Sequence, residues 1–187
     1  MNTTRRIFRL VLALLLLAGA SRATTLQRMS LDELVAASGA VVRARAVASV
    51  SRWENGHIWT FTTFEVLETM KGGTPSRVEV RLIGGRVGSL TSKVDGVPRF
   101  HAGDEAFLFL ATTPSGHWTV TGWALGTFRI ARDSSSGKES VTQDAAGTTL
   151  FDPATRTFRA GGVRRMPVEE FRQQLAAAVT RTAGRQR

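Results

Sequence analysis

The sequence predicts a mainly β fold in which five strands close into a barrel, with a short helix before them and an amphipathic helix after them. Three observations support this prediction. Five segments between residues 40 and 130 have the composition or the period-2 alternation of strands. Glycine-rich and proline-containing turns separate these segments. Helix start signals stand near residues 30 and 167.

Residues 1–23 predict a cleavable signal peptide. Arg5, Arg6 and Arg9 precede an apolar run over residues 10–20, and the small-x-small end at Ala23 is typical of a signal peptidase site. The apolar run is too short for the roughly 20 residues that span a bilayer. We therefore expect cleavage after Ala23, a periplasmic or secreted mature chain and no transmembrane segment in it.

The Arg5-Arg6 pair leaves two export routes open. It resembles the twin-arginine pattern, which is read by the pathway that exports folded proteins. The four consecutive leucines over residues 14–17 make the core more apolar than is usual for twin-arginine signals. This favours the general secretory route.

The first element of the mature chain is a predicted helix over residues 31–38. Ser30 is its expected N-cap, Glu33 is the capping-box partner, and Met29 is placed to pack on Leu34. Gly39 suits the left-handed position that follows a helix.

Five strands are expected next. The first has a period-2 alternation, and its inner face is expected to carry small residues suited to a closed barrel: Val42, Ala44, Ala46, Ala48 and Val50. Asn55-Gly56 predicts the hairpin turn after it. Gly122 and Gly126 predict bulges or kinks in the fifth strand. The predicted strands cover residues 40–52, 57–69, 77–82, 105–112 and 117–130.

Residues 84–98 form the longest predicted loop of the barrel, and long loops on rigid scaffolds often carry function. After the barrel, residues 141–143 and 148–151 predict a small hairpin. Pro167 begins the last helix, whose apolar stripe contains Val168, Phe171, Leu175 and Val179. The expected organisation is a signal peptide over 1–23, a barrel domain over 24–131, and an appended hairpin, helix and basic tail over 132–187.

Charge and cysteine content bound the function. The net charge of +10 falls to +6 when the four arginines of the signal peptide are removed. Residues 24–155 have no net charge, so the positive charge of the mature chain lies after residue 155. The chain has no cysteine. This excludes thiolate chemistry, cysteine-based zinc sites, iron–sulfur clusters and disulfides.

The strand pattern fits an OB-like barrel. In addition, the helix, the first strand from Ser38 to Ala46 and the Lys71-Gly72 turn resemble the netrin-like module of the tissue inhibitors of metalloproteinases, best over residues 30–83. The segment Gly96 to Glu105 resembles one shared by uncharacterised exported bacterial proteins. The resemblance implies a netrin-like barrel. The inhibitors chelate zinc through a disulfide-tied N-terminal cysteine, which this chain lacks, so their mechanism does not transfer to it.

The sequence contains few candidate catalytic residues. His101 with Asp104 and Glu105 offers metal-ligand chemistry, but the Gly103-Asp104 pair predicts a turn. Ser89, His101 and Asp104 are the residues from which a hydrolase triad would have to assemble, and His57 and His117 lie beside predicted turns. No catalytic, metal or cofactor-binding residue is therefore predicted, and a small periplasmic hydrolase or metal-dependent enzyme that uses His101 and Asp104 is the alternative.

Tryptophans and arginines give a candidate binding face, although tryptophans that fill the barrel core are the competing interpretation. The leading hypothesis is an exported non-catalytic module that recognises a protein, such as an exported protease, through the barrel mouth and the 84–98 loop. A binder of envelope glycans or polyanions is a further alternative, and export disfavours nucleic acid. The candidate face consists of Arg43, Arg45, Trp53, Trp59, Arg86, Trp118 and Trp123.

Overall fold

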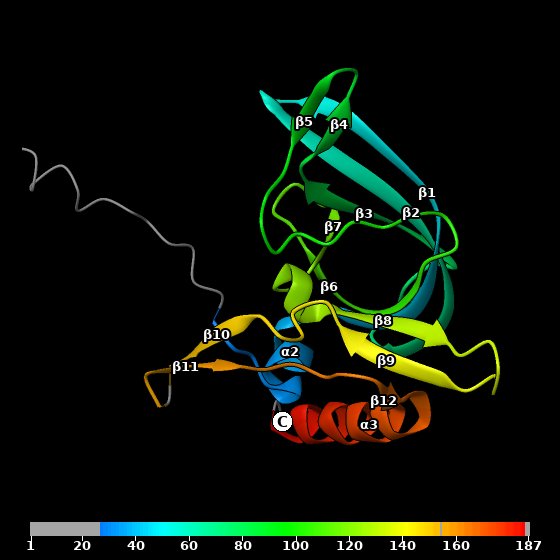
Figure 1. The fold of residues 1–187 in the computed structure, drawn as a ribbon, viewed down its shortest axis with the longest axis vertical. Coiled ribbons are helices and arrows are strands. Elements are labelled where there is room, and N and C mark those ends of the chain that lie inside the picture. The colour runs from blue at the N-terminus through cyan, green and yellow to red at the C-terminus, as the bar shows by residue number, and fades with distance from the viewer. Residues whose placement is uncertain (1–26, 154, 186–187) are drawn as a thin grey trace, which may run out of the picture.

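The structure is a computed structural model that describes residues 27–153 and 155–185. The predicted signal peptide lies outside these residues. The described chain is mainly β, with two α-helices and one short 3-10 helix (Figure 1). In chain order the elements are α2 (Leu31–Ala37), β1 (Ala40–Glu54), β2 (His57–Lys71), β3 (Arg77–Ile83), β4 (Gly85–Val87), β5 (Leu90–Ser92), β6 (Glu105–Thr112), β7 (Trp118–Val120), η1 (Trp123–Gly126), β8 (Thr127–Arg132), β9 (Glu139–Gln143), β10 (Thr149–Asp152), β11 (Thr157–Ala160), β12 (Met166–Pro167) and α3 (Val168–Arg185).

Five strands are hydrogen bonded in a ring. Their order is β1-β2-β3-β7-β6, and β6 pairs again with β1. All of these pairings are antiparallel except β3 with β7, which meet in parallel at Val80 and Trp118. The same sheet continues from β6 through β8 and β9 to β12. The ring and its extension therefore share β6 (Figure 1).

The capping prediction for the first helix is confirmed. Ser30 Oγ accepts from the Glu33 amide, and a Glu33 carboxylate oxygen accepts from the Ser30 amide. The prediction for Gly39 is wrong, because this residue is not in the left-handed region. Its amide donates to the carbonyl of Leu110, so the chain leaves the helix directly as an extended strand.

Strand β1 follows the predicted inner face only up to Ala46. Ala48 and Val50 are exposed, which corrects that part of the prediction. The pairing with β2 shifts register between Ala46 and Ala48. Because one extra residue moves every following side chain to the opposite face, the shift ends the buried alternation.

The predicted fifth strand, residues 117–130, is three elements. β7 closes the ring, η1 interrupts the chain, and β8 pairs with β6 outside the ring. The break occurs where Gly122 and Trp123 both take positive φ angles of 60° and 54°. Gly126 is packed so closely that an added Cβ would lie 2.2 Å from the carbonyl oxygen of Thr121.

Two other segments also differ from the prediction. The 84–98 loop contains the β4–β5 hairpin, whose register pairs Arg86 with Thr91. The predicted hairpin between residues 141–143 and 148–151 is wrong, since β9 pairs with β8 and β12, and β10 pairs with β11. The glycine pair 161–162 lies between β11 and β12, a segment that the prediction left without structure.

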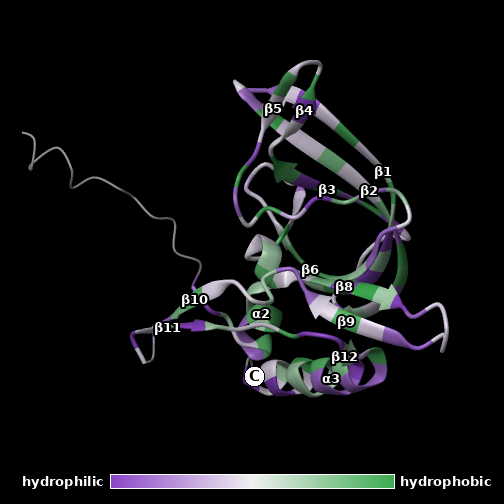
Figure 2. Ribbon diagram, in the orientation of Figure 1, coloured by the Kyte–Doolittle hydropathy of each residue, from purple (hydrophilic) through white to green (hydrophobic). Residues whose placement is uncertain are grey.

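Two hydrophobic cores organise the fold. One fills the ring, with Phe64, Leu108 and Leu110 fully buried beside small residues such as Ala44 and Ala106. The other lies between the outside of the sheet and the two helices. Its centre is three tilted rings, Phe107, Phe128 and Phe171, with neighbouring centroids 4.8–5.0 Å apart. Apolar and polar stretches alternate along α3, as a helix with one buried side requires (Figure 2).

In the described part of the chain, no helix combines the length and the apolar character needed to cross a membrane.

Candidate functional site

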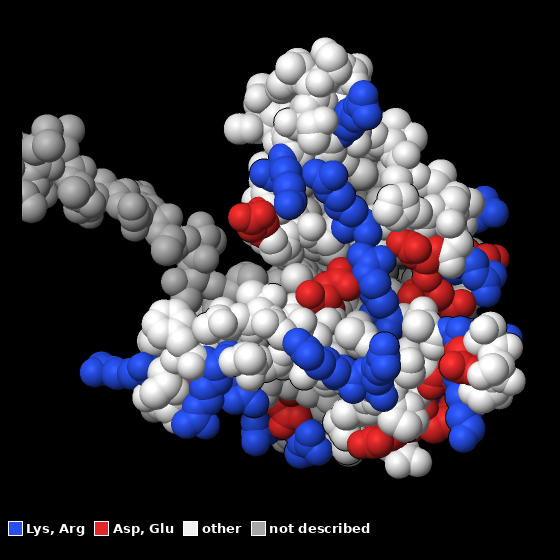
Figure 3. All heavy atoms as spheres, in the orientation of Figure 1, with Lys and Arg blue, Asp and Glu red and all other residues white. Residues whose placement is uncertain are grey.

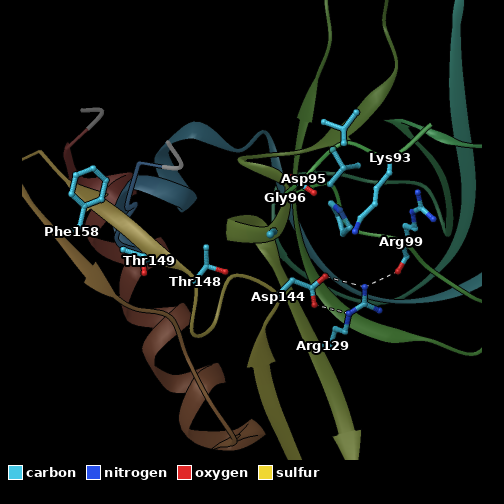
Figure 4. Close-up of a pocket in the computed structure, with 13 residues that line it drawn as sticks. Lys93, Asp95, Gly96, Arg99, Arg129, Asp144, Thr148, Thr149 and Phe158 are labelled. Carbon is cyan, nitrogen blue, oxygen red and sulfur yellow. Dashed lines mark hydrogen bonds and ion pairs between the residues drawn. The ribbon is translucent and has the colours of Figure 1, made fainter. Parts of the chain in front are cut away.

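A large hollow lies between the segment after β5 and the β10–β11 hairpin. Its volume is about 800 Å³, within the usual range of ligand sites. We call it the hairpin groove. Figure 4 shows residues 93–99 on one side, the hairpin on the other and Arg129 with Asp144 at the bottom. Its lining is Lys93, Val94, Asp95, Gly96, Val97, Pro98, Arg99, Ala124, Arg129, Asp144, Thr148, Thr149 and Phe158.

Arg129 on β8 holds the bottom of the groove in place. Its Nε and Nη2 donate to the two carboxylate oxygens of Asp144 at 2.6 and 3.0 Å. Nη1 donates to Asp104 at 3.0 Å, and Nη2 also donates to the carbonyl of Arg99 at 2.7 Å. The guanidinium carbon lies 4.9 Å from the centroid of the Phe100 ring. The Arg129 guanidinium thus links three loops to the sheet. Because two carboxylates already neutralise its charge, it is not available to bind an anionic ligand.

The ring side of the groove carries charges that the protein does not neutralise. Among the described residues, Lys93 and Asp95 have no hydrogen-bond or ion-pair partner. The Arg99 guanidinium donates only to the carbonyl of Ser92, at 3.3 Å. Figure 4 shows all three on the same side of the groove. Two cations and one anion are therefore available to a bound partner.

The hairpin side offers an apolar contact. Phe158 is 61% exposed, the highest value among the large hydrophobic residues of the described chain. It pairs with Phe151 across β10 and β11, and the two ring centroids lie 5.2 Å apart. β10 is in turn fixed to the start of the described chain by a parallel bridge to Gln27. A fixed, exposed aromatic ring is the usual form of an apolar anchor at a binding surface.

Basic side chains surround the hairpin. Within the described structure no acidic partner is found for Arg156, Arg159, Arg164 or Arg165. Figure 3 shows Lys and Arg side chains at the lower left of the molecule, where β10 and β11 lie, whereas most of the visible Asp and Glu side chains lie in the centre and on the right. The charge balance around the groove is therefore positive.

A second hollow, of about 600 Å³, holds two of the predicted binding residues, Arg43 and Arg45. Arg43 Nη2 contacts Glu105 and lies 3.1 Å from Glu139, and Arg45 pairs with Glu105 at 3.5 Å. Burial opposes the charge of Arg43, but the hydrogen bond to Glu105 and the attraction of both glutamates raise the pKa of Arg43 above its ordinary value. The charges of Arg43 and Arg45 are therefore neutralised by acidic side chains of the protein itself.

The remaining predicted binding residues lie in three places. Trp118 and Trp123 are partly buried against the ring core. Trp59 packs under the guanidinium of Arg81, 3.8 Å from its ring centroid. Trp53 and Arg86 are exposed, in the β1–β2 and β4–β5 hairpins. The structure does not gather the predicted face into a single patch, and its binding role stays a prediction.

The candidate catalytic residues are not assembled into a recognisable set. His101 is exposed and lies 3.7 Å from Asp104, whose carboxylate is also bound by Arg129. His57 is in the β1–β2 turn region, and His117 packs edge-on against Phe61. Within the described residues, no group of three histidine or acidic side chains is placed to hold a metal ion.

Comparison with known proteins gives no family. No protein-family model, no curated protein and no solved structure matches the chain. The function is therefore argued from the geometry of the hairpin groove.

Sequence reasoning found one side of this groove and missed the other. The length of the 84–98 segment predicts a functional loop, and in the structure this segment supplies Lys93 and Asp95 to the lining of the groove. Phe158, Arg129 and Asp144 were not predicted. Phe158 had one usable signal, since it is an isolated aromatic residue in an otherwise polar, arginine-rich segment.

Proposed function

We propose that this protein is an exported, non-catalytic binding module that takes an acidic segment of another extracytoplasmic protein into the hairpin groove. The observation that carries the proposal is the combination in one groove of an exposed Phe158 with two cations, Lys93 and Arg99, that lack acidic partners. Export rests on the predicted signal peptide of residues 1–23.

We also infer that the scaffold is a closed OB-like or netrin-like barrel. The ring order β1-β2-β3-β7-β6 supports this inference, as does the parallel contact of β3 with β7 between otherwise antiparallel neighbours. The core inside the ring, with its small side chains on β1, suits the narrow interior of a five-stranded barrel.

A polypeptide segment fits the groove better than a compact small molecule. The hollow is open and long enough to touch two separate parts of the chain, residues 93–99 and the hairpin. It offers an apolar contact at Phe158 and unpaired charge on the opposite side. An acidic side chain next to an apolar one would satisfy both sides at once.

A polyanion binder, such as a module for an acidic envelope glycan, is the second candidate. The unpaired arginines of the hairpin and the segment after it favour it, because repeated cations suit a repeated anion. It differs from the leading proposal in one respect: a polyanion has no need of Phe158. Binding of a polyanion is expected to depend steeply on salt and hardly at all on that ring.

The test is selection of peptides from a random 12-residue library displayed against the purified protein. We expect enrichment of peptides that combine acidic with aromatic or aliphatic residues. Calorimetric titration of an enriched peptide should give a Kd about tenfold weaker for Phe158→Ser and for Lys93→Glu. The control Arg132→Glu changes an exposed cation outside the groove, and its Kd should equal that of the wild type.

Two outcomes would overturn the proposal. One is a selection without any enriched peptide. The other is an enriched peptide whose Kd is the same for wild type, Phe158→Ser and Lys93→Glu. If a sulfated or uronic-acid glycan binds instead, with an affinity that is insensitive to Phe158→Ser, the second candidate replaces the first.

A further inference from the structure

The end of the molecule farthest from α3 exposes large apolar side chains. The β1–β2 and β4–β5 hairpins both project there, at the top of Figure 1. Val50 is 60% exposed, Trp53 52% and Leu90 56%. Of the six exposed large hydrophobic residues in the described chain, five lie in these two hairpins, and Val47 and Leu67 are farther from the β1–β2 turn than Val50 and Trp53. Figure 2 shows apolar stretches along the β4–β5 ribbon. We call this end the distal tip.

The charge of the distal tip is positive. Arg52 has no ion pair within the described structure and lies with its guanidinium 3.7 Å from the centroid of the Phe61 ring. Arg86 donates only to the carbonyl of Gly88. The single acidic residue in β1–β2 near the turn, Glu54, is already paired with Arg81 at 2.9 Å. Two cations therefore remain without a counter-charge.

The two hairpins are held as one body. The β4–β5 hairpin folds onto β1 and β2, where Gly85 lies against the hydroxyls of Ser51 and Thr60. Those two hydroxyls are hydrogen bonded to each other at 2.8 Å, and Thr60 also donates to the carbonyl of Gly84 at 2.7 Å. The exposed side chains thus stand on a fixed support.

We propose that the distal tip docks this protein on the surface of an anionic lipid bilayer. A tryptophan and aliphatic side chains at projecting hairpin ends suit the interface between headgroups and acyl chains, where tryptophan is enriched. Arg52 and Arg86 complement the negative headgroups. The small hollow beside the β4–β5 hairpin, of about 170 Å³, is lined by Arg86 but by none of the three exposed apolar side chains, which are therefore available to a flat surface such as a bilayer. This inference is independent of the hairpin groove.

The test is co-sedimentation of the purified protein with vesicles of phosphatidylcholine alone or mixed with phosphatidylglycerol. We expect binding to the mixed vesicles and about fivefold weaker partitioning for each of Arg52→Gln and Arg86→Gln. The double variant Trp53→Ser/Leu90→Ser should lose roughly tenfold or more, because less apolar area enters the interface. Arg132→Gln and Leu67→Ser serve as controls that remove an exposed cation and an exposed apolar side chain elsewhere, and both should bind like the wild type.

Fluorescence shows whether the tip itself enters the lipid. The chain has four tryptophans, so the Trp53 signal is the difference between wild type and Trp53→Phe. We expect that difference spectrum to shift to the blue on vesicles and to be quenched by brominated acyl chains. The proposal is overturned by absence of binding to anionic vesicles, by equal binding of the tip variants and wild type, or by an unshifted Trp53 signal. Sedimentation as a dimer that Trp53→Ser/Leu90→Ser dissociates, without vesicle binding, would assign the tip to a second copy of the chain.

Discussion

Arg129 and Asp144 form a two-point ion pair that joins the main sheet to the chain entering the β10–β11 hairpin. Arg129 lies on β8, and Asp144 follows directly after β9. Both side chains are partly buried, with 33% and 17% of their surfaces exposed. The same guanidinium binds Asp104 and the carbonyl of Arg99, so the position of both sides of the hairpin groove depends on one residue.

Replacement of Arg129 should therefore destabilise the protein more than replacement of an ordinary surface arginine. Arg129→Met leaves Asp144 without its partner in a partly buried site, and we expect a loss of about 2–3 kcal/mol in the free energy of unfolding. Arg132→Met is the matched control, since Arg132 is 72% exposed and contacts Glu139 only at 4.0 Å. Its cost should stay below about 0.5 kcal/mol. Urea denaturation measures both values, and equal losses would contradict this role of Arg129.

The register shift in β1 predicts opposite effects for two similar alanines. Ala44 is fully buried inside the ring, whereas Ala48 is exposed beyond the shift. Ala44→Leu should overpack the ring core and cost about 2 kcal/mol. Ala48→Leu should change stability by less than about 0.5 kcal/mol. Thermal or urea unfolding compares the two, and an Ala48→Leu variant as unstable as Ala44→Leu would show that the alternation continues past the shift.

Much of the fold could be predicted from local signals. The Ser30 and Glu33 capping box specified the first helix, and the Asn55-Gly56 turn has the positive φ angles, 51° and 79°, that such a hairpin requires. The register shift after Ala46 could not be predicted in this way. Nothing in an alternating run of small residues marks where one residue is skipped, because that choice depends on the partner strand.

Gly85 should tolerate no side chain. Its φ angle is 136°, and an added Cβ would lie 2.3 Å from Ser51 Oγ and 2.4 Å from Thr60 Oγ1. Gly85→Ala should therefore cost about 2–3 kcal/mol and displace the β4–β5 hairpin. Gly88 also has a positive φ, of 58°, but an added Cβ there meets no atom within 4 Å. Gly88→Ala should cost only about 1 kcal/mol. A denaturation midpoint that is equally low for both variants would contradict the close approach at Gly85.

The contact of the last helix with the first should make stability sensitive to acid. Arg181 donates to both carboxylate oxygens of Asp32, at 2.6 and 3.0 Å, and this hydrogen bond lowers the pKa of Asp32 below its ordinary value of 3.8. A lowered pKa in the folded state means that the stabilisation is complete above the unfolded pKa and disappears as the pH falls through the folded pKa.

Asp32→Asn should accordingly flatten the dependence of Tm on pH below about pH 4. Arg181→Gln should flatten it in the same way, and the double variant should add nothing further. Asp95→Asn, which removes a carboxylate without a partner among the described residues, is the control and should leave the slope as in the wild type. Parallel slopes for wild type and Asp32→Asn would contradict the proposed linkage.

The candidate site was harder to predict than the fold for a physical reason. Its two sides are about 60 residues apart in the sequence and meet only because β8 and β9 extend the sheet beyond the ring. The predicted hairpin of residues 141–143 with 148–151 placed Asp144 in a local turn. In the structure Asp144 does lie in a turn, and it also accepts a hydrogen bond from Arg129 of the neighbouring strand, which the local sequence does not indicate. Arg43 and Arg45, by contrast, looked free in the sequence because their partner Glu105 is 60 or more residues away.

The measurement that tests the central claim most directly is chemical-shift mapping of an enriched acidic peptide on the ¹⁵N-labelled protein. The account predicts that the amide signals of residues 93–99, 144–149 and 157–160 shift on titration and that those of the Arg43 and Arg45 hollow do not. Shifts confined to that second hollow, or to the turn of His101, would contradict the assignment of the hairpin groove as the binding site.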